Sequence, residues 1–175
     1  MKYISRIFKT GAVRKTPSRI IRAILSEVKS ADHVHIIEFG AGQGEITKPL
    51  AEEIASRKDP VYFAFELDKN FSSLLKRDLQ NVTVLAEDAF AYEDFIPDHF
   101  KADFIISSLP LSFYPRESLH KFLESLQRRL RQNGKLVILF HAFWLIPMFK
   151  GIFKPPIIRR FATFPPYFLL VFEKS

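Results

Sequence analysis

A glycine-rich turn between two acidic residues is the part of this 175-residue sequence best suited to bind a small molecule. The turn reads Glu38-Phe-Gly-Ala-Gly-Gln-Gly-Glu45 and follows an apolar run. Its glycines permit positive φ and let the backbone approach a ligand closely, although a tight strand-to-helix turn without a ligand is the alternative. The spacing G-x-G-x-G differs from the dinucleotide pattern G-x-G-x-x-G. Carboxylates at Glu38 and Glu45 would repel a pyrophosphate and attract a ligand that carries sulfonium and ammonium charges.

Two further acidic residues follow later apolar runs. Glu66 closes the run 61–66, where a carboxylate can accept hydrogen bonds from both hydroxyls of a ribose. Asp88 follows the run 82–86 and can accept a hydrogen bond from an adenine amino group. Each acid alone is typical of a solvated loop. Ligands of open α/β sheets bind beyond the carboxyl ends of the strands, so three acids at successive strand ends indicate a single site.

Short apolar runs that alternate with amphipathic segments position these residues. We expect strands over 33–39, 61–66, 82–86, 102–107, 135–140, 159–164 and 167–173. We expect helices over 17–28, 46–58, 70–79 and 116–132, the last capped by Asn133-Gly134. Strands that alternate with helices indicate a mostly parallel sheet covered on both faces. Pro165-Pro166 indicates a tight antiparallel connection between the last two strands, and we expect one domain over residues 1–175.

The charge is distributed unevenly along the chain. Residues 1–26 hold seven Lys or Arg and no acid, residues 125–175 hold nine and one acid, and residues 27–124 hold ten against eighteen acids. Basic ends suggest an anionic partner, either nucleic acid or an acidic membrane surface, with an ordinary solvated surface as the alternative. The absence of cysteine excludes a disulfide scaffold and a thiolate zinc site, and we expect no metal. The longest apolar run, 136–149, is too short and interrupted to span a bilayer.

With this turn and these acids, the sequence from about Lys15 to its C-terminus resembles the S-adenosylmethionine-dependent methyltransferases of the Rossmann-like class. The resemblance implies a three-layer α/β fold with a seven-stranded, mostly parallel sheet whose last strand is antiparallel. It also implies S-adenosylmethionine as the cofactor, with Glu66 at the ribose and Asp88 at the adenine. The residues that we expect to contact the cofactor are Gly11, Ser18, Glu38, Gly40, Ala41, Gly42, Gly44, Glu66, Leu67, Asp88, Ala89 and Ser107.

The segment after the fourth strand bears on the methyl acceptor. It reads Ser107-Ser-Leu-Pro-Leu-Ser-Phe-Tyr-Pro115. Amino-group methyltransferases commonly carry Asn/Asp-Pro-Pro-Tyr/Phe here, and ribosomal RNA adenine dimethyltransferases carry Asn-Leu/Ile-Pro-Tyr. This chain has Ser108 in place of the acid or amide and Leu111 in place of the aromatic residue. A flipped adenine would lose stacking worth about 1–3 kcal/mol, which argues against adenine as the acceptor.

The same segment, Ser-Ser-Leu-Pro-Leu, resembles the Ser-Gly-Leu-Pro-Leu of bacterial phospholipid N-methyltransferases. Gly11-Ala-Val followed by Pro17-Ser18 is similar to that family's Gly-Ala-Val-x-Pro-Ser start, and Phe164-Pro-Pro-Tyr167 to its Leu-Pro-Pro-Ala. This resemblance implies N-methylation of a phospholipid head group, with phosphatidylethanolamine as the expected acceptor. One alternative is RNA adenine N-methylation, in which the basic ends grip phosphates. Another is a non-catalytic module that binds membranes or nucleic acid.

Methyl transfer needs a neutral amine held in line with the sulfonium methyl group. We expect backbone carbonyls around Ser108 and Leu109 to orient this amine, and Tyr114 or His141 to assist its loss of a proton. His141 follows the strand 135–140 and should lie at the ligand edge of the sheet. A hydrogen-bonded structural histidine is an equal alternative.

Two segments favour a peripheral place at the inner, cytoplasmic face of a membrane. Residues 1–29 form a basic extension, and a helix over 2–9 would separate bulky apolar side chains from Lys and Arg. Residues 141–156 form a loop in which aromatic and aliphatic residues are interspersed with Lys. The alternatives are a helix that packs on the domain and an internal hydrophobic plug.

Overall fold

A computed structural model describes residues 15–29 and 34–174 of the chain. These residues form a seven-stranded sheet in the order β3-β2-β1-β4-β5-β7-β6. Strands β1 to β5 pair in parallel, and β7 lies antiparallel between β5 and β6. This topology confirms the predicted fold, including the antiparallel last strand. The strands are β1 His35–Phe39, β2 Val61–Phe65, β3 Thr83–Leu85, β4 Ala102–Ser107, β5 Leu130–Phe140, β6 Ile157–Phe161 and β7 Tyr167–Glu173.

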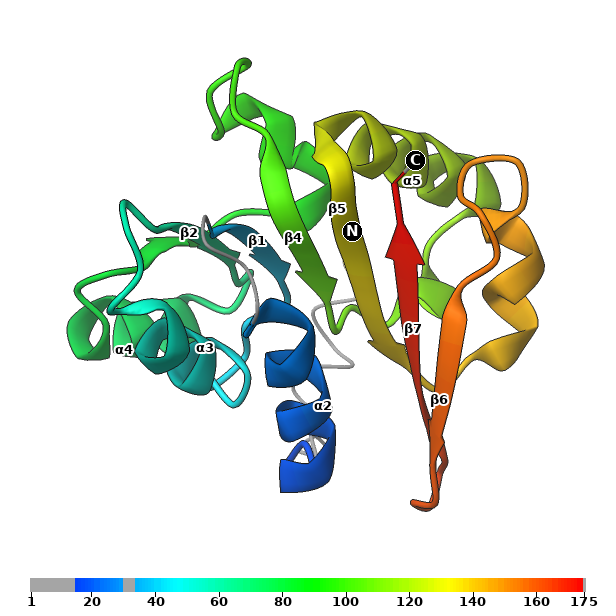
Figure 1. Ribbon diagram of the computed structural model, residues 1–175, viewed down its shortest axis with the longest axis horizontal. Coiled ribbons are helices and arrows are strands. Elements are labelled where there is room, and N and C mark those ends of the chain that lie inside the picture. The colour runs from blue at the N-terminus through cyan, green and yellow to red at the C-terminus, as the bar shows by residue number, and fades with distance from the viewer. Residues whose placement is uncertain (1–14, 30–33, 175) are drawn as a thin grey trace.

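Helices cover both faces of the sheet (Figure 1). One face packs against α2 (Ser18–Val28), α3 (Thr47–Ile54) and α4 (Lys69–Asp78). The other face packs against α5 (Arg116–Arg129) and the 3-10 helices η1 (Ala89–Asp94) and η3 (Phe143–Phe149). A shorter 3-10 helix, η2 (Leu111–Phe113), follows β4. Neighbouring strand residues such as Ile36 and Ile37 point to opposite faces of the sheet. Both are fully buried because helices cover both faces.

The junction of α5 and β5 differs from the prediction. The helix ends at Arg129 and the strand begins at Leu130, so Asn133-Gly134 lies inside β5 and does not cap a helix. Asn133 has φ 61° and forms an irregularity where the register between β4 and β5 shifts. Its backbone N–H donates to the Lys174 carbonyl at 3.0 Å, and the Lys174 N–H donates to the Gly134 carbonyl at 2.9 Å. Asn133 supplies the left-handed backbone conformation that is typical of both a bulge and a helix cap.

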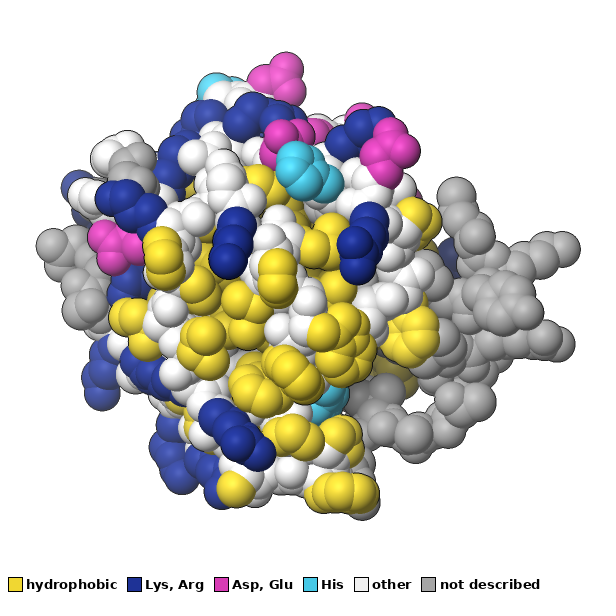
Figure 2. Space-filling model, turned by 90° about the vertical axis from the view of Figure 1, so that its right-hand side faces the viewer, with side chains coloured by type: hydrophobic (Ala, Val, Ile, Leu, Met, Phe, Trp, Pro, Cys, Tyr) yellow, Lys and Arg dark blue, Asp and Glu magenta, His cyan; other side chains and the backbone are white. Residues whose placement is uncertain are grey.

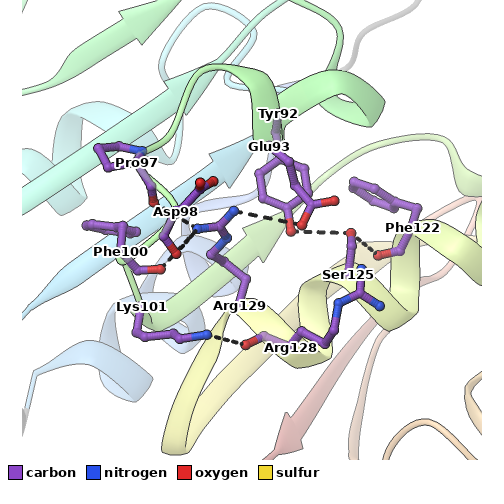
Figure 3. Close-up of polar contacts among 10 residues, drawn as sticks. All are labelled: Tyr92, Glu93, Pro97, Asp98, Phe100, Lys101, Phe122, Ser125, Arg128 and Arg129. Atoms are coloured by element: carbon purple, nitrogen blue, oxygen red, sulfur yellow. Dashed lines mark hydrogen bonds and ion pairs between the residues drawn. The ribbon is translucent and has the colours of Figure 1, made fainter.

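A buried arginine connects the end of α5 to the loop before β4 (Figure 3). This contact lies near the amino-terminal end of β4, away from the carboxyl ends of the parallel strands. Arg129 Nη1 donates to the carbonyls of Pro97, Asp98 and Phe100 at 2.9, 3.2 and 3.2 Å. Its guanidinium also lies over the Tyr92 ring, 5.7 Å from the centroid. The end of α5 is thereby tied to the loop that leads into β4.

The predicted loop 141–156 is partly helical and has two sides. Within η3, Leu145 and Phe149 are buried in the core, whereas Phe143 and Trp144 are exposed. The internal plug and the exposed surface were alternatives in the sequence, and the structure contains both. The amphipathic segment predicted within residues 2–9 and the candidate Gly11 lie outside the described residues.

Candidate cofactor and acceptor site

A cavity of about 480 Å³ opens where the carboxyl ends of β1, β2, β4 and β5 meet. Three segments line it: the glycine turn after β1, the segment after β4 and the start of the segment after β5. The topology brings these segments together because parallel strands end at the same edge of the sheet. Of the candidate residues, the cavity is lined by Glu38, Gly40, Ala41, Gly42, Glu66, Ser108, Leu109 and His141.

Gly40 lets the turn and the segment after β4 approach each other closely. Its carbonyl accepts a hydrogen bond from Ser108 Oγ at 2.7 Å, and its N–H donates to the Phe65 carbonyl at 2.9 Å. A Cβ on residue 40 would lie 3.1 Å from Ser108 Oγ and 3.2 Å from Leu109 Cδ2, and the backbone has φ +78°. Only glycine fits this position without displacing its neighbours.

Glu38 places a buried carboxyl in the wall of the cavity. It is 1% exposed, and Tyr62 Oη donates to its Oε2 at 2.6 Å. Among the described residues, its Oε1 has no hydrogen-bond partner. Burial raises the pKa of Glu38 to about 7. A buried carboxylate oxygen without a partner suits a cationic ligand such as the sulfonium and ammonium groups of S-adenosylmethionine.

Glu66 links the glycine turn to the segment after β2. Its Oε2 accepts a hydrogen bond from the Gly42 N–H at 2.7 Å, and its Oε1 accepts one from the Asp68 N–H at 2.8 Å. Burial raises its pKa. Each carboxylate oxygen can accept a second hydrogen bond, so both keep the capacity to bind ribose hydroxyls. Glu66 therefore fits the role predicted for it.

A smaller cavity shares Gly40, Glu66 and Leu109 with the larger one. It is also lined by the candidates Leu67, Asp88, Ala89 and Tyr114. Asp88 Oδ1 accepts a hydrogen bond from the Phe90 N–H at 3.0 Å, which starts η1. This cavity lies where the adenine is expected.

Tyr114 lies at this adenine end and does not line the larger cavity. Its ring stacks on Phe90 with centroids 4.1 Å apart. Burial raises the pKa of Tyr114 to about 12, so its hydroxyl is protonated at neutral pH and cannot take up a proton. This position and protonation state do not favour the predicted part in proton loss.

His141 lines the larger cavity in a fixed orientation. Its Nδ1 lies 2.7 Å from the Pro166 carbonyl, and its ring centroid lies 3.9 Å from that of Tyr167. Because a carbonyl only accepts, Nδ1 carries the hydrogen, and Nε2 of the neutral ring has a lone pair. The hydrogen bond expected of a structural histidine is therefore present at Nδ1. It leaves Nε2 able to accept a proton.

Three candidates lie outside both cavities. Ser18 is exposed at the start of α2, while Lys15 and Thr16 line the larger cavity instead. Gly44 faces α4, where an added Cβ would lie 2.6 Å from Leu75 Cδ2. The Ser107 hydroxyl is buried and accepts a long hydrogen bond from the Leu109 N–H at 3.4 Å. Of these three residues, Ser107 bonds to a lining residue, Leu109, and Gly44 lies in the turn that lines the site.

Several residues of the site were absent from the sequence prediction. Tyr62 orients Glu38, and the Thr16 N–H donates to Glu45 Oε2 at 2.8 Å. Phe113 and Trp144 line the larger cavity and are also exposed. The alternation of β2 marks Tyr62 as inward-facing, but only the strand register places it beside Glu38. Within residues 15–29 and 34–174, no group of three or more His, Cys, Asp or Glu residues could hold a metal ion.

Comparison with known sequences agrees with this geometry. A protein-family model described as a methyltransferase domain matches residues 36–134. The ribosomal RNA small subunit methyltransferase A of Buchnera aphidicola is 30% identical over 95 residues, which are 53% of this chain and 35% of that protein. The probable counterpart from Pyrobaculum islandicum is 38% identical over 78 residues, 44% of this chain and 29% of that protein. The chain thus spans about a third of the length of these curated relatives.

Solved structures share the fold. The magnesium protoporphyrin IX methyltransferase from Synechocystis PCC 6803, solved with bound S-adenosylmethionine, superposes with a TM-score of 0.69 at 13% identity, covering 90% of this chain and 79% of that one. At such identity the likeness shows the fold alone. Together with the family match, it supports S-adenosylmethionine as the cofactor of this site.

Proposed function

The chain belongs to the methyltransferase domain family, and we propose that it transfers the methyl group of S-adenosylmethionine to the amine of a phospholipid head group such as phosphatidylethanolamine. One observation carries the choice of acceptor. The mouth of the larger cavity is bordered by exposed aromatic side chains, Phe113 at 54% and Trp144 at 62% exposure, and both also line the cavity.

The surface beside this mouth is apolar and basic. Figure 2 shows hydrophobic side chains gathered across this face, with Lys and Arg side chains set among them. The exposed hydrophobic residues of η3, β6 and the turn between β6 and β7 are Phe143, Trp144, Ile157, Ile158 and Phe164. Exposed cations are Lys150, Lys154 and Arg160. Aromatic residues interspersed with cations suit the head-group region of an anionic bilayer.

The exposed side of η3 is held outward by its buried side. The Phe149 ring stacks on Phe172 of β7 with centroids 4.7 Å apart, and Leu145 is also buried. Because these contacts fix the helix on the sheet, Phe143 and Trp144 project from a rigid support. No helix of the described part of the chain is long and apolar enough to cross a membrane. We propose peripheral binding at the inner face of the membrane because η3 presents exposed Phe143 and Trp144 in a segment that also carries exposed Lys150 and Lys154.

The residues of the chain perform three tasks in this proposal. Glu38 and Glu66 bind the cofactor, which when bound supplies an electrophilic methyl group. The segment around Ser108 holds the amine, while the apolar walls of the cavity exclude water. His141, with Nδ1 fixed by the Pro166 carbonyl, accepts the amine's proton at Nε2.

A second candidate is RNA N-methylation, and the curated relatives support it better than the lipid proposal. Both relatives described above are named as ribosomal RNA methyltransferases. The basic surface would then bind phosphates. Against it, the buried Leu111 lies where a base-stacking aromatic residue would lie. A non-catalytic module is the third candidate, and the intact carboxyl groups of the cofactor site argue against it.

Labelled S-adenosylmethionine offered separately with vesicles containing phosphatidylethanolamine and with ribosomal RNA distinguishes these candidates. We expect label in the lipid, and none with Glu66→Ala, which removes the proposed ribose partner. Label only in the RNA contradicts the lipid proposal. Failure of the wild-type protein to bind the cofactor would support the non-catalytic module.

A further inference from the structure

We propose that the Ser108 hydroxyl accepts a hydrogen bond from the attacking amine and thereby restricts fast transfer to the first two methyl groups. This inference rests on the proposed function only in requiring an amine as the acceptor. The number of methyl groups follows from the hydrogens that the amine can donate to Ser108.

The hydrogen bonding of Ser108 leaves its oxygen as an acceptor only. A serine hydroxyl has one hydrogen and two lone pairs. Ser108 Oγ donates its hydrogen to the Gly40 carbonyl at 2.7 Å. The half-buried side chain lines the larger cavity beside Gly40, and its oxygen can take part in a further hydrogen bond only as an acceptor.

Neighbouring groups are less suited to hold the amine. The Leu109 carbonyl, predicted to orient it, already uses one of its two lone pairs to accept from the Leu111 N–H at 2.8 Å and belongs to a residue that is only 7% exposed. The Ser107 hydroxyl is buried and lies outside the cavity. The Ser112 hydroxyl lines the cavity but is exposed, so water competes for it. Ser108 is therefore the better placed acceptor of an N–H.

Each transfer changes what the amine can donate. In the first, the nitrogen lone pair forms a bond to the methyl carbon while the carbon–sulfur bond breaks, and sulfur keeps the bonding electrons. The resulting ammonium group loses one proton to His141 Nε2 or to water, which leaves a secondary amine with one N–H. The second transfer and proton loss leave a tertiary amine with none. That amine can place only a methyl group next to Ser108 Oγ, so the oxygen loses its N–H donor.

The products formed on phosphatidylethanolamine vesicles by wild type and Ser108→Ala test this inference. We expect the wild-type protein to accumulate the dimethyl lipid. Loss of the hydrogen bond should slow the first two transfers by about 3- to 10-fold and leave the third unchanged or faster. Ser26→Ala is the matched control, because the Ser26 hydroxyl also donates to a backbone carbonyl at 2.7 Å, that of Ala23, away from the site.

The outcomes separate this inference from its rivals. If Ser108 only braces the Gly40 turn, S108A will weaken cofactor binding and slow all three transfers equally. If Ser112 holds the amine, Ser112→Ala and not S108A will change the product ratio. Identical product ratios in wild type and S108A contradict the inference on Ser108 alone. If label enters RNA and none enters the vesicles, the lipid proposal alone is contradicted. The effect of S108A is then measured on the methylation rate of the RNA amine.

Discussion

Among single residues, Glu38 couples cofactor binding to pH. Its pKa is raised to about 7 by burial, whereas a bound cation favours the ionised form. Binding of S-adenosylmethionine below neutral pH must therefore release a proton. We expect the dissociation constant, measured by calorimetry, to rise by up to about tenfold per unit as pH falls below 7. Glu38→Gln should bind S-adenosylmethionine weakly at every pH. If the dissociation constant of this variant depended on pH as steeply as that of wild type, Glu38 would not be the group that titrates.

The same carboxyl should lower the stability of the protein at alkaline pH. Because the folded pKa lies above the ordinary value of 4.5, the stabilising contribution of the neutral form is complete below about pH 4.5 and is lost as pH rises through 7. Glu38→Gln stays neutral and can still accept from Tyr62. We expect its free energy of unfolding at pH 8 to exceed that of wild type by on the order of 3 kcal/mol. Equal urea midpoints at pH 8 would argue against a buried charge.

Two glycines of the turn should respond differently to alanine. At Gly44 the backbone has φ +89° and an added Cβ would lie 2.6 Å from Leu75 Cδ2, so Gly44→Ala should cost about 1–3 kcal/mol of stability. At Gly42 the backbone has φ +56°, but an added Cβ meets no atom of the described residues within 4 Å, so Gly42→Ala should cost only the backbone strain of about 1 kcal/mol and mainly obstruct the cofactor. Urea unfolding and calorimetry together check this pair. A greater loss of stability in G42A than in G44A would contradict the assignment of Gly44 to packing and of Gly42 to cofactor access.

At the scale of elements, Arg129 holds the end of α5 to the loop before β4. Its side chain is 7% exposed, and replacement by methionine removes the donor to the carbonyls of Pro97, Asp98 and Phe100, of which that of Phe100 is buried. We expect Arg129→Met to lower the free energy of unfolding by about 3 kcal/mol and Arg128→Met, at an exposed neighbour, by about 0.5 kcal/mol or less. Cofactor affinity should be unchanged in folded R129M, because Arg129 lies at the opposite edge of the sheet. Equal losses in the two variants would show that these hydrogen bonds contribute little.

The elements themselves were largely predictable because their apolar periodicities are strong. The strand ranges before 107 agree with the structure within about two residues, and β7 agrees at both ends. The prediction failed at Asn133-Gly134, where a bulge and a helix cap require the same backbone conformation. It was incomplete at η3, since an apolar sequence does not say which of its side chains face the core.

At the scale of the whole molecule, the sequence predicted those residues of the site that directly follow parallel strands. Glu38, Glu66 and Asp88 line the two adjoining cavities because parallel strands share an edge. Tyr62 was not predicted, because its contact with Glu38 depends on register between strands. Gly44 was assigned to the cofactor because sequence spacing does not reveal which way a turn faces.

We propose that the cavity mouth faces a lipid surface, and the tryptophan emission of the protein reports directly on this contact. Trp144 is the only tryptophan of the chain and lies at the cavity mouth, 62% exposed. We expect anionic vesicles containing phosphatidylethanolamine to shift its emission to shorter wavelength and lipids brominated near the head group to quench it. Ribosomal RNA at the same charge concentration should cause no such shift. Emission that RNA changes and vesicles leave unaltered would contradict the account.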